Sequence, residues 1–180
     1  TDFAPVADVW SNAENQVIGD RSFGTDSEKV AEMVTEAVRG FHDSYIRTAV
    51  KHFPGHGNTA EDSHSGFAYN YGTKEELENR EWKPFAAGIK EQSEFVMVGH
   101  ICCPNIISKE IPASLSKKLV TDVLRNEMEF NGIIITDAMD MGAVTAHYSC
   151  GEAAVQAVEA GADMILMPEN FQEAYEAVLQ

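Results

Sequence analysis

The clearest structural signal in the chain is the run Gly132-Ile133-Ile134-Ile135-Thr136-Asp137, in which three isoleucines stand together without a polar residue between them. A strand that faces water on one side alternates apolar and polar residues, whereas a strand buried on both sides is apolar throughout. The run is therefore typical of a strand in a parallel sheet that other elements cover on both faces.

Four further short apolar runs lie along the chain, and amphipathic stretches separate most of them. The predicted strands span residues 3–9, 48–53, 94–100, 132–137 and 164–167. The predicted helices are 28–41 capped by Asp26 or Ser27, 74–91 kinked or restarted at Pro84, 119–128 capped by Ser116, 152–160 ended by Gly161, and a last helix opened by Asn170.

This β-α pattern, repeated about five times, fits an open doubly wound sheet or a (β/α) barrel. A doubly wound sheet that binds a dinucleotide carries a G-x-G-x-x-G motif after its first strand. The nearest match, Gly55-His56-Gly57, lacks the third glycine and lies in a polar segment. We therefore expect the barrel.

The composition excludes several classes of partner. The 180 residues include 13 Lys and Arg against 29 Asp and Glu, which gives a formal net charge of −16. An acidic chain without a basic cluster is a poor match for nucleic acid or an anionic membrane surface. No apolar run approaches the roughly 18 residues that a membrane span needs. We expect neither nucleic acid as a partner nor a membrane span.

Polar side chains gather at one end of the predicted strands. Asp8, Lys51 with His52, His100 and Asp137 each lie at or near the C-terminal end of an apolar run. The C-terminal ends of barrel strands share one face, on which active sites are built. One charged residue at a strand end is usually a solvated loop position, but four such ends indicate a functional site.

Residues 51–64 form the densest polar segment, with three of the six histidines of the chain. The segment is open to three interpretations: a polar surface loop, a metal site or an acid/base pair. A zinc site would draw on His52, His56, Asp62 and His64, although proline and glycine prevent a helix between the first two histidines. In an acid/base pair, Asp62 would hold His64 and fix the tautomer of its imidazole.

Asp137 is the other candidate, because a carboxylate directly after a buried strand is held as rigidly as a nucleophile must be. Its plainer interpretation is a loop cap or a helix N-cap. Asp140 falls beyond the strand and is expected to be mainly structural. Met139 and Met141 are expected to belong to the core or the wall of the site.

Taken together, these residues resemble the β-N-acetylglucosaminidase branch of glycoside hydrolase family 3. The strongest matching stretches are residues 3–9, 17–24, 51–64 and 135–141, with weaker support from 111–116 and 161–168. The segment from Lys51 to His64, with KHFPGHG at its start and Asp62-Ser63-His64 at its end, is specific, because the β-glucosidases of the family lack this histidine dyad.

The resemblance implies a retaining mechanism with a covalent glycosyl-enzyme intermediate. Asp137 matches the nucleophile, His64 the general acid/base, and Asp62 the partner of His64. Glycosidases usually use a pair of carboxylates, so a histidine takes the place of the acid here, in a loop that can close over substrate.

The resemblance also implies the substrate and leaves one alternative open. Arg21, Lys51 and His52 match residues that hydrogen-bond a terminal N-acetylglucosamine, as in peptidoglycan fragments or chitin-type sugars. It implies no metal and no other cofactor. Relatives with this histidine have also been considered as phosphorylases, because a neutral histidine repels phosphate less than a carboxylate does.

The length of the chain limits how much of the barrel it contains. A (β/α)8 barrel typically needs about 250 residues, and the resemblance places its first strands before this sequence and its last strand after it. We therefore expect an α/β fold, a partial TIM (β/α)8 barrel of about five central β/α units with parallel strands. Residues 1–180 would then be part of a single catalytic barrel.

An incomplete barrel has consequences for activity and association. The isolated chain is expected to show weak or no activity, so a non-catalytic or structural part of such a barrel is the main alternative. Exposed strand edges would also favour self-association.

Overall fold

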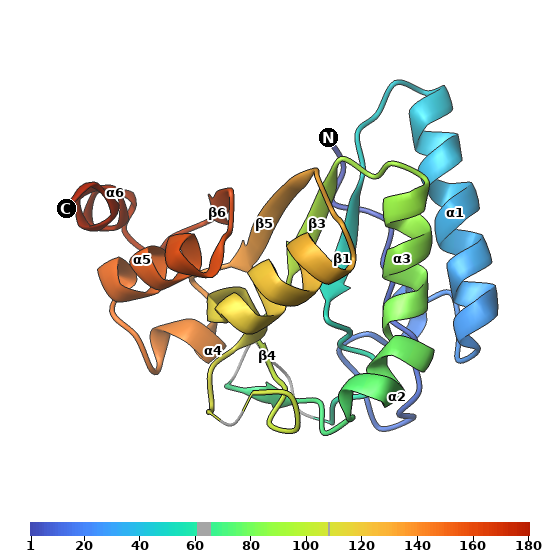
Figure 1. Ribbon diagram of the computed structural model, residues 1–180, viewed down its shortest axis with the longest axis horizontal. Coiled ribbons are helices and arrows are strands. Elements are labelled where there is room, and N and C mark those ends of the chain that lie inside the picture. Colours follow the sequence, from blue (N-terminus) through green and yellow to red (C-terminus); the bar gives the residue numbers. More distant parts are fainter. Residues whose placement is uncertain (61–65, 108) are drawn as a thin grey trace.

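The computed structural model describes residues 1–60, 66–107 and 109–180, and its centre is a parallel sheet (Figure 1). Within these residues the sheet has four regular strands, in the order β1 (Ala49–Phe53), β3 (Phe95–Val98), β5 (Ile133–Ala138) and β6 (Met164–Leu166). All neighbours in the sheet are parallel. Four of the five predicted strands are thereby confirmed.

The fifth predicted strand, residues 3–9, is an extended segment beside β1 rather than a regular strand. It forms parallel bridges from Asp2 to Thr48 and from Val6 to Lys51. Pro5 precedes the second bridge and has no N–H to donate, which interrupts the ladder. The segment still adds a fifth parallel element, on the side of β1 away from β3.

The order of the strands decides between the two predicted architectures. Each strand lies next to the one before it in the β-α series, from residues 3–9 through β1, β3 and β5 to β6. A doubly wound sheet reverses direction at a switch point, whereas a barrel adds every unit on the same side. The chain therefore forms part of a (β/α) barrel, as predicted.

Helices cover one face of the sheet, and Figure 1 shows α1 and α3 side by side at one end, with α5 and α6 at the other. The α-helices are α1 (Ser27–Asp43), α2 (Lys74–Asn79), α3 (Trp82–Lys90), α4 (Gly142–Thr145), α5 (Cys150–Ala160) and α6 (Phe171–Leu179). No helix among the described residues is long and apolar enough to cross a membrane.

The sequence does not predict several of the short elements. They are the parallel pair β2 (Ala68–Tyr69) and β4 (Ile101–Cys102), helix α4, and the 3-10 turns η1 (Gly19–Arg21) and η2 (Ala113–Leu115). None of them is long enough to show a helical or strand period, which is the signal that sequence reasoning uses.

Most predicted helix ends are confirmed. The side chain of Asp26 caps α1, Gly161 ends α5 with a φ of 108°, and Asn170 caps α6. The predicted helix 74–91 is divided into α2 and α3, and Pro84 lies in the first turn of α3, where its missing N–H leaves no helical bond unmade.

The helix predicted after Ser116 differs from the prediction in kind. It is a π-helix, η3 (Lys118–Glu127), in whose last turn the Met128 N–H donates to the Val123 carbonyl at 2.8 Å. Its start lies beyond the predicted cap, although the Ser116 hydroxyl still accepts from the Leu119 N–H at 3.4 Å. Apolar spacing in a short segment does not separate a π-helix from an α-helix.

The two faces of the sheet are filled by different side chains. Ile134 belongs to the large core that the sheet shares with the helices. Ile135 belongs to a smaller cluster on the opposite, inner face, with Ala49, Phe95 and Met97. Side chains alternate along a strand, so Asp137 follows Ile135 on the inner face. The barrel fold thus turns the last polar residue of β5 towards the barrel interior.

Gly88 of α3 gives a test of this packing. A Cβ at Gly88 would lie 2.6 Å from the Val50 side chain of β1, so we expect Gly88→Ala to lower the free energy of unfolding by roughly 1–3 kcal/mol. The matched control is Gly40→Ala in α1, where nothing lies within 4 Å and a gain of about 0.5–1 kcal/mol is expected. Urea denaturation measures both variants; equal stabilities would contradict the close approach of α3 to β1.

Candidate active site

A small cavity of about 170 Å³ lies at the C-terminal ends of the strands. Its lining residues are Phe3, Val17, Ile18, Arg21, Lys51, His52, His56, Met97, Asp137 and Leu166. It brings together four of the six predicted site residues, Arg21, Lys51, His52 and Asp137. The other two, Asp62 and His64, lie outside the described residues.

The carboxylate of Asp8 binds His52 and His56, two of the residues that line this cavity. It is fully buried and accepts three hydrogen bonds, from His52 N at 3.2 Å, His52 Nδ1 at 2.8 Å and His56 N at 2.6 Å. Burial by itself raises the pKa of Asp8, but the electrostatic attraction of His52 and His56 and the hydrogen bonds that they donate outweigh burial and hold that pKa below its usual value.

These contacts fix the protonation pattern of His52. Its Nε2 lies 3.3 Å from Nη2 of Arg21, and a guanidinium has only donors. Nε2 therefore accepts, and the ring proton is on Nδ1, where it is donated to Asp8. Arg21 also donates from Nη1 to the Val17 carbonyl at 3.1 Å. The chain Asp8–His52–Arg21 thus holds the guanidinium at the edge of the cavity.

Lys51 adds a second cation to the lining. Its side chain is half-buried, and burial lowers its pKa, as does the positive charge of Arg21. The carboxylates of Asp137, Asp2 and Asp8 act in the opposite direction. Lys51 and His52 are adjacent in β1 yet both line the cavity, and the peptide bond between them is cis.

Asp137 presents its carboxylate to the same cavity. Its Oδ1 accepts from the N–H of Ala138 at 2.8 Å, and no described residue hydrogen-bonds to Oδ2. One oxygen is thus anchored to the end of β5, while the other is left open by the part of the chain that the structure describes. This arrangement suits a nucleophile, which needs a fixed direction and an unoccupied lone pair.

The segment after β1 is tied to residues 9–15. The Asn15 amide donates to the carbonyls of His56 at 2.7 Å and Thr59 at 3.0 Å. A Cβ at Gly57 would lie 2.0 Å from the Val9 carbonyl oxygen, so only glycine allows this approach. Sequence reasoning placed Asp8 at a strand end without giving it a role and did not find Asn15, whose partners are 41 and 44 residues away.

The described residues contain no group of three or more His, Cys, Asp or Glu side chains that could hold a metal ion. Two of the four ligands in the zinc interpretation, Asp62 and His64, lie outside those residues.

Burial lowers the pKa of His56, although Asp8 opposes that effect. The His56 Nδ1 lies 2.8 Å from the Thr59 hydroxyl.

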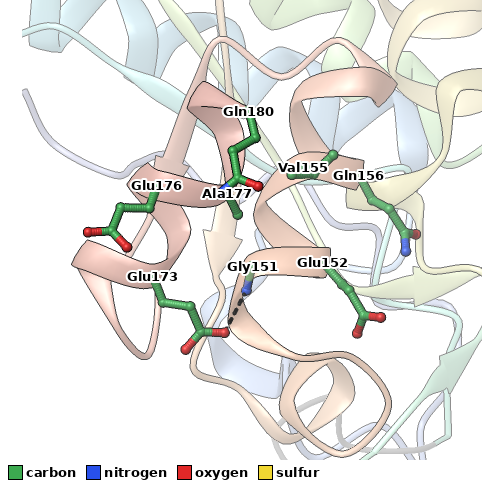
Figure 2. A pocket seen from close by; sticks show the side chains of 8 residues that line it. All are labelled: Gly151, Glu152, Val155, Gln156, Glu173, Glu176, Ala177 and Gln180. Atoms are coloured by element: carbon green, nitrogen blue, oxygen red, sulfur yellow. Dashed lines mark hydrogen bonds between the residues drawn. The ribbon is translucent and has the colours of Figure 1, made fainter.

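A larger cavity of about 540 Å³ lies between α5 and α6 (Figure 2). Its lining includes the carboxylates of Glu152, Glu173 and Glu176, and Glu173 accepts from the Gly151 N–H at 3.1 Å. This cavity lies between outer helices and not at the strand ends. We assign the candidate active site to the smaller cavity, because a carboxylate, two cationic side chains and two imidazoles converge there.

Comparison with known proteins identifies the family. Residues 1–180 match the family described as the glycosyl hydrolase family 3 N terminal domain. The chain belongs to this family. The family 3 domain is 37% identical to a beta-hexosaminidase of Stenotrophomonas maltophilia strain K279a over 180 residues, covering 98% of the chain and 52% of the relative. The chain thus spans about half the length of this curated relative.

Solved structures share the fold closely. A family 3 β-N-acetylglucosaminidase from Paenibacillus sp. str. FPU-7 superposes with a TM-score of 0.95 at 43% identity, covering 98% of this chain and 34% of that one. The beta-glucoside phosphorylase BglX superposes with a TM-score of 0.93 at 31% identity, covering 98% and 33%. Both similarities span the partial barrel and its strand ends.

The role of Asp8 in this family 3 domain can be tested by stability. In Asp8→Asn a single carbonyl oxygen replaces two acceptors, so an NH₂ group faces a buried N–H of His52 or His56. We expect a loss of about 1–3 kcal/mol in the free energy of unfolding. The control Asp20→Asn, exposed in η1, should stay within about 0.5 kcal/mol. Denaturant titration that finds no difference between the two variants would contradict the role of Asp8.

The same variant predicts a pH dependence. The pKa of Asp8 is lowered in the folded state, so its contribution to stability is fully present above the unfolded value of about 3.9. That contribution is lost as the pH falls through the lowered pKa. The stability difference between the wild type and Asp8→Asn should therefore be constant near neutral pH and shrink only below about pH 4. A difference that shrinks between pH 7 and 5 would contradict this assignment.

Proposed function

We propose that this chain carries the catalytic face of a retaining glycoside hydrolase that removes terminal, non-reducing β-linked N-acetylglucosamine. The observation that carries the proposal is the cavity in which one carboxylate oxygen of Asp137 has no hydrogen bond from a described residue and lies with Arg21, Lys51 and His52 in the lining. The names of the relatives, beta-hexosaminidase and β-N-acetylglucosaminidase, support the choice of sugar. The natural polypeptide that carries this chain, whatever its length, is the protein to test.

The first half of the reaction would use Asp137 and His64. Asp137 Oδ2 attacks the anomeric carbon, the glycosidic C–O bond breaks, and the leaving oxygen takes a proton from His64. The product is an ester between the sugar and Asp137, together with the released alcohol. In the second half, water attacks the same carbon while His64 accepts its proton, and Asp137 is released as a carboxylate. Asp62 would hold His64 in the required tautomer.

The sugar would be held by the cations of the cavity. Arg21 and Lys51 carry only donors, which suit the hydroxyl and acetamido oxygens of the sugar. Both ring nitrogens of His52 are engaged, with Asp8 and with Arg21. We therefore propose that in this arrangement His52 supports sugar binding by holding the guanidinium of Arg21.

Asp137→Asn tests the nucleophile. Loss of the attacking oxygen should lower kcat on nitrophenyl β-N-acetylglucosaminide by roughly a thousandfold or more. The control is Asp140→Asn, an exposed carboxylate just beyond β5, which should retain activity within about threefold. Nitrophenol release measures both, and equal activity in Asp137→Asn and wild type would refute the assignment.

His64→Ala tests the general acid. A nitrophenolate leaves without a proton, whereas a sugar alcohol does not, so the variant should lose about 10²–10⁴-fold in kcat on a β-linked N-acetylglucosamine disaccharide and far less on the nitrophenyl glycoside. His42→Ala, at the end of α1, is the control and should affect neither substrate. Equal losses on both substrates would argue against proton donation by His64.

Phosphorolysis is a second candidate function, because one structural relative is named a beta-glucoside phosphorylase. The cations Arg21 and Lys51 would also attract an anion into the cavity. Turnover in the presence of inorganic phosphate distinguishes the two reactions. A sugar 1-phosphate would establish phosphorolysis, and free sugar alone at every phosphate concentration would exclude it.

A further inference from the structure

His100 is a buried histidine that the proposed mechanism does not use. It lies just after β3, and its side chain is sealed from solvent. Both ring nitrogens have partners: Nδ1 lies 2.7 Å from the Ser114 hydroxyl, and Nε2 lies 2.9 Å from the Ala138 carbonyl oxygen. These partners come from η2 and from the end of β5, 14 and 38 residues away in the sequence.

The chemistry of these partners fixes the tautomer. A carbonyl oxygen only accepts hydrogen bonds, so the proton of His100 is on Nε2. Nδ1 then accepts, and the Ser114 hydroxyl donates to it. Burial lowers the pKa of His100, which favours this neutral ring, although the Ala138 carbonyl and the charge of Asp137 oppose that effect.

The His100 contact reaches Ala138, the residue whose N–H anchors the candidate nucleophile, through the next peptide unit along the chain. Ala138 donates its N–H to Asp137 Oδ1 at 2.8 Å, and its carbonyl accepts from His100. The regular pairing of β3 with β5 ends at Val98 and Thr136, so no strand ladder holds the Ala138 carbonyl on the β3 side. The imidazole of His100 takes the place of the next ladder bond.

We propose that His100, oriented by Ser114, is a positioning residue that holds the Asp137 carboxylate in its direction of attack. This inference rests on the proposed function, since it assigns Asp137 the role of nucleophile. A residue that only fills the core would affect stability alone. A positioning residue affects kcat at constant KM and is rescued by a side chain that restores the donor to Ala138.

The test compares variants that keep or remove this donor. His100→Leu removes it and should lower kcat about 10–100-fold with KM within about threefold, because misplacement of a reacting group by up to about 1 Å has effects of this size. His100→Gln retains an N–H that can donate to Ala138 and should recover at least half of that loss on a logarithmic scale.

A matched control loses a buried polar pair at the opposite end of the strands. The Thr48 hydroxyl donates to Ser93 at 2.9 Å, so Thr48→Val should lower stability without lowering kcat. If His100→Leu does not fold, Ser114→Ala replaces it. In Ser114→Ala the ring of His100 is free to take the other tautomer, and kcat should fall about 3–10-fold. A wild-type kcat in His100→Leu or in Ser114→Ala would overturn the proposal. So would a kcat of His100→Gln no higher than that of His100→Leu.

A readout without turnover separates this inference from the proposed function. Nitrogen-15 NMR should find His100 protonated on Nε2, and the Ala138 amide proton should exchange slowly in wild type and Thr48→Val but faster in His100→Leu. Unchanged exchange in His100→Leu would overturn the positioning role. Absence of turnover in the wild type, with the expected exchange pattern, would refute the glycosidase proposal and leave the His100 contact established.

Discussion

The buried carboxylate of Asp8 holds the candidate active site together. An ionised group with no access to water is strongly destabilising unless hydrogen bonds replace its hydration. Here three N–H groups do so, two from His52 and one from His56. Because Asp8 belongs to the extended segment beside β1 and its partners lie at the end of β1 and in the loop beyond, the charge can be satisfied only when these parts are in register.

The arrangement of the site follows from the burial of the Asp8 charge and from the alternation of side chains along β5. One face of β5 supplies Ile134 to the core under the helices, and the other supplies Ile135 and then Asp137 to the interior of the barrel. The same alternation that buries the strand therefore directs its last carboxylate into the cavity. The stability of the sheet and the direction of Asp137 have one cause, which is the order in which the residues of β5 alternate between the two faces of the sheet.

The sequence predicts what depends on local periodicity and does not predict what depends on distant contacts. The strand at 132–137 and a kink or new helix start near Pro84 are readable from neighbouring residues alone; the structure confirms the strand and starts a new helix at Trp82, two residues before Pro84. The bonds from Asp8 to His52 and from His100 to Ala138 join residues 44 and 38 positions apart, so their existence depends on packing. The resemblance to family 3 identifies Arg21, Lys51 and Asp137 as site residues. Only the structure shows that Asp8 orients Arg21 through His52.

The anchoring of Arg21 changes the thermodynamics of binding at the site. A free arginine loses rotational freedom when a ligand captures it, at a cost of about 0.5–1.5 kcal/mol for an immobilised long side chain. In this protein Nη1 bonds to the Val17 carbonyl and Nη2 to His52 before any ligand is present. The entropy loss therefore belongs to folding rather than to binding, and a ligand that enters the cavity meets a donor whose direction is already set.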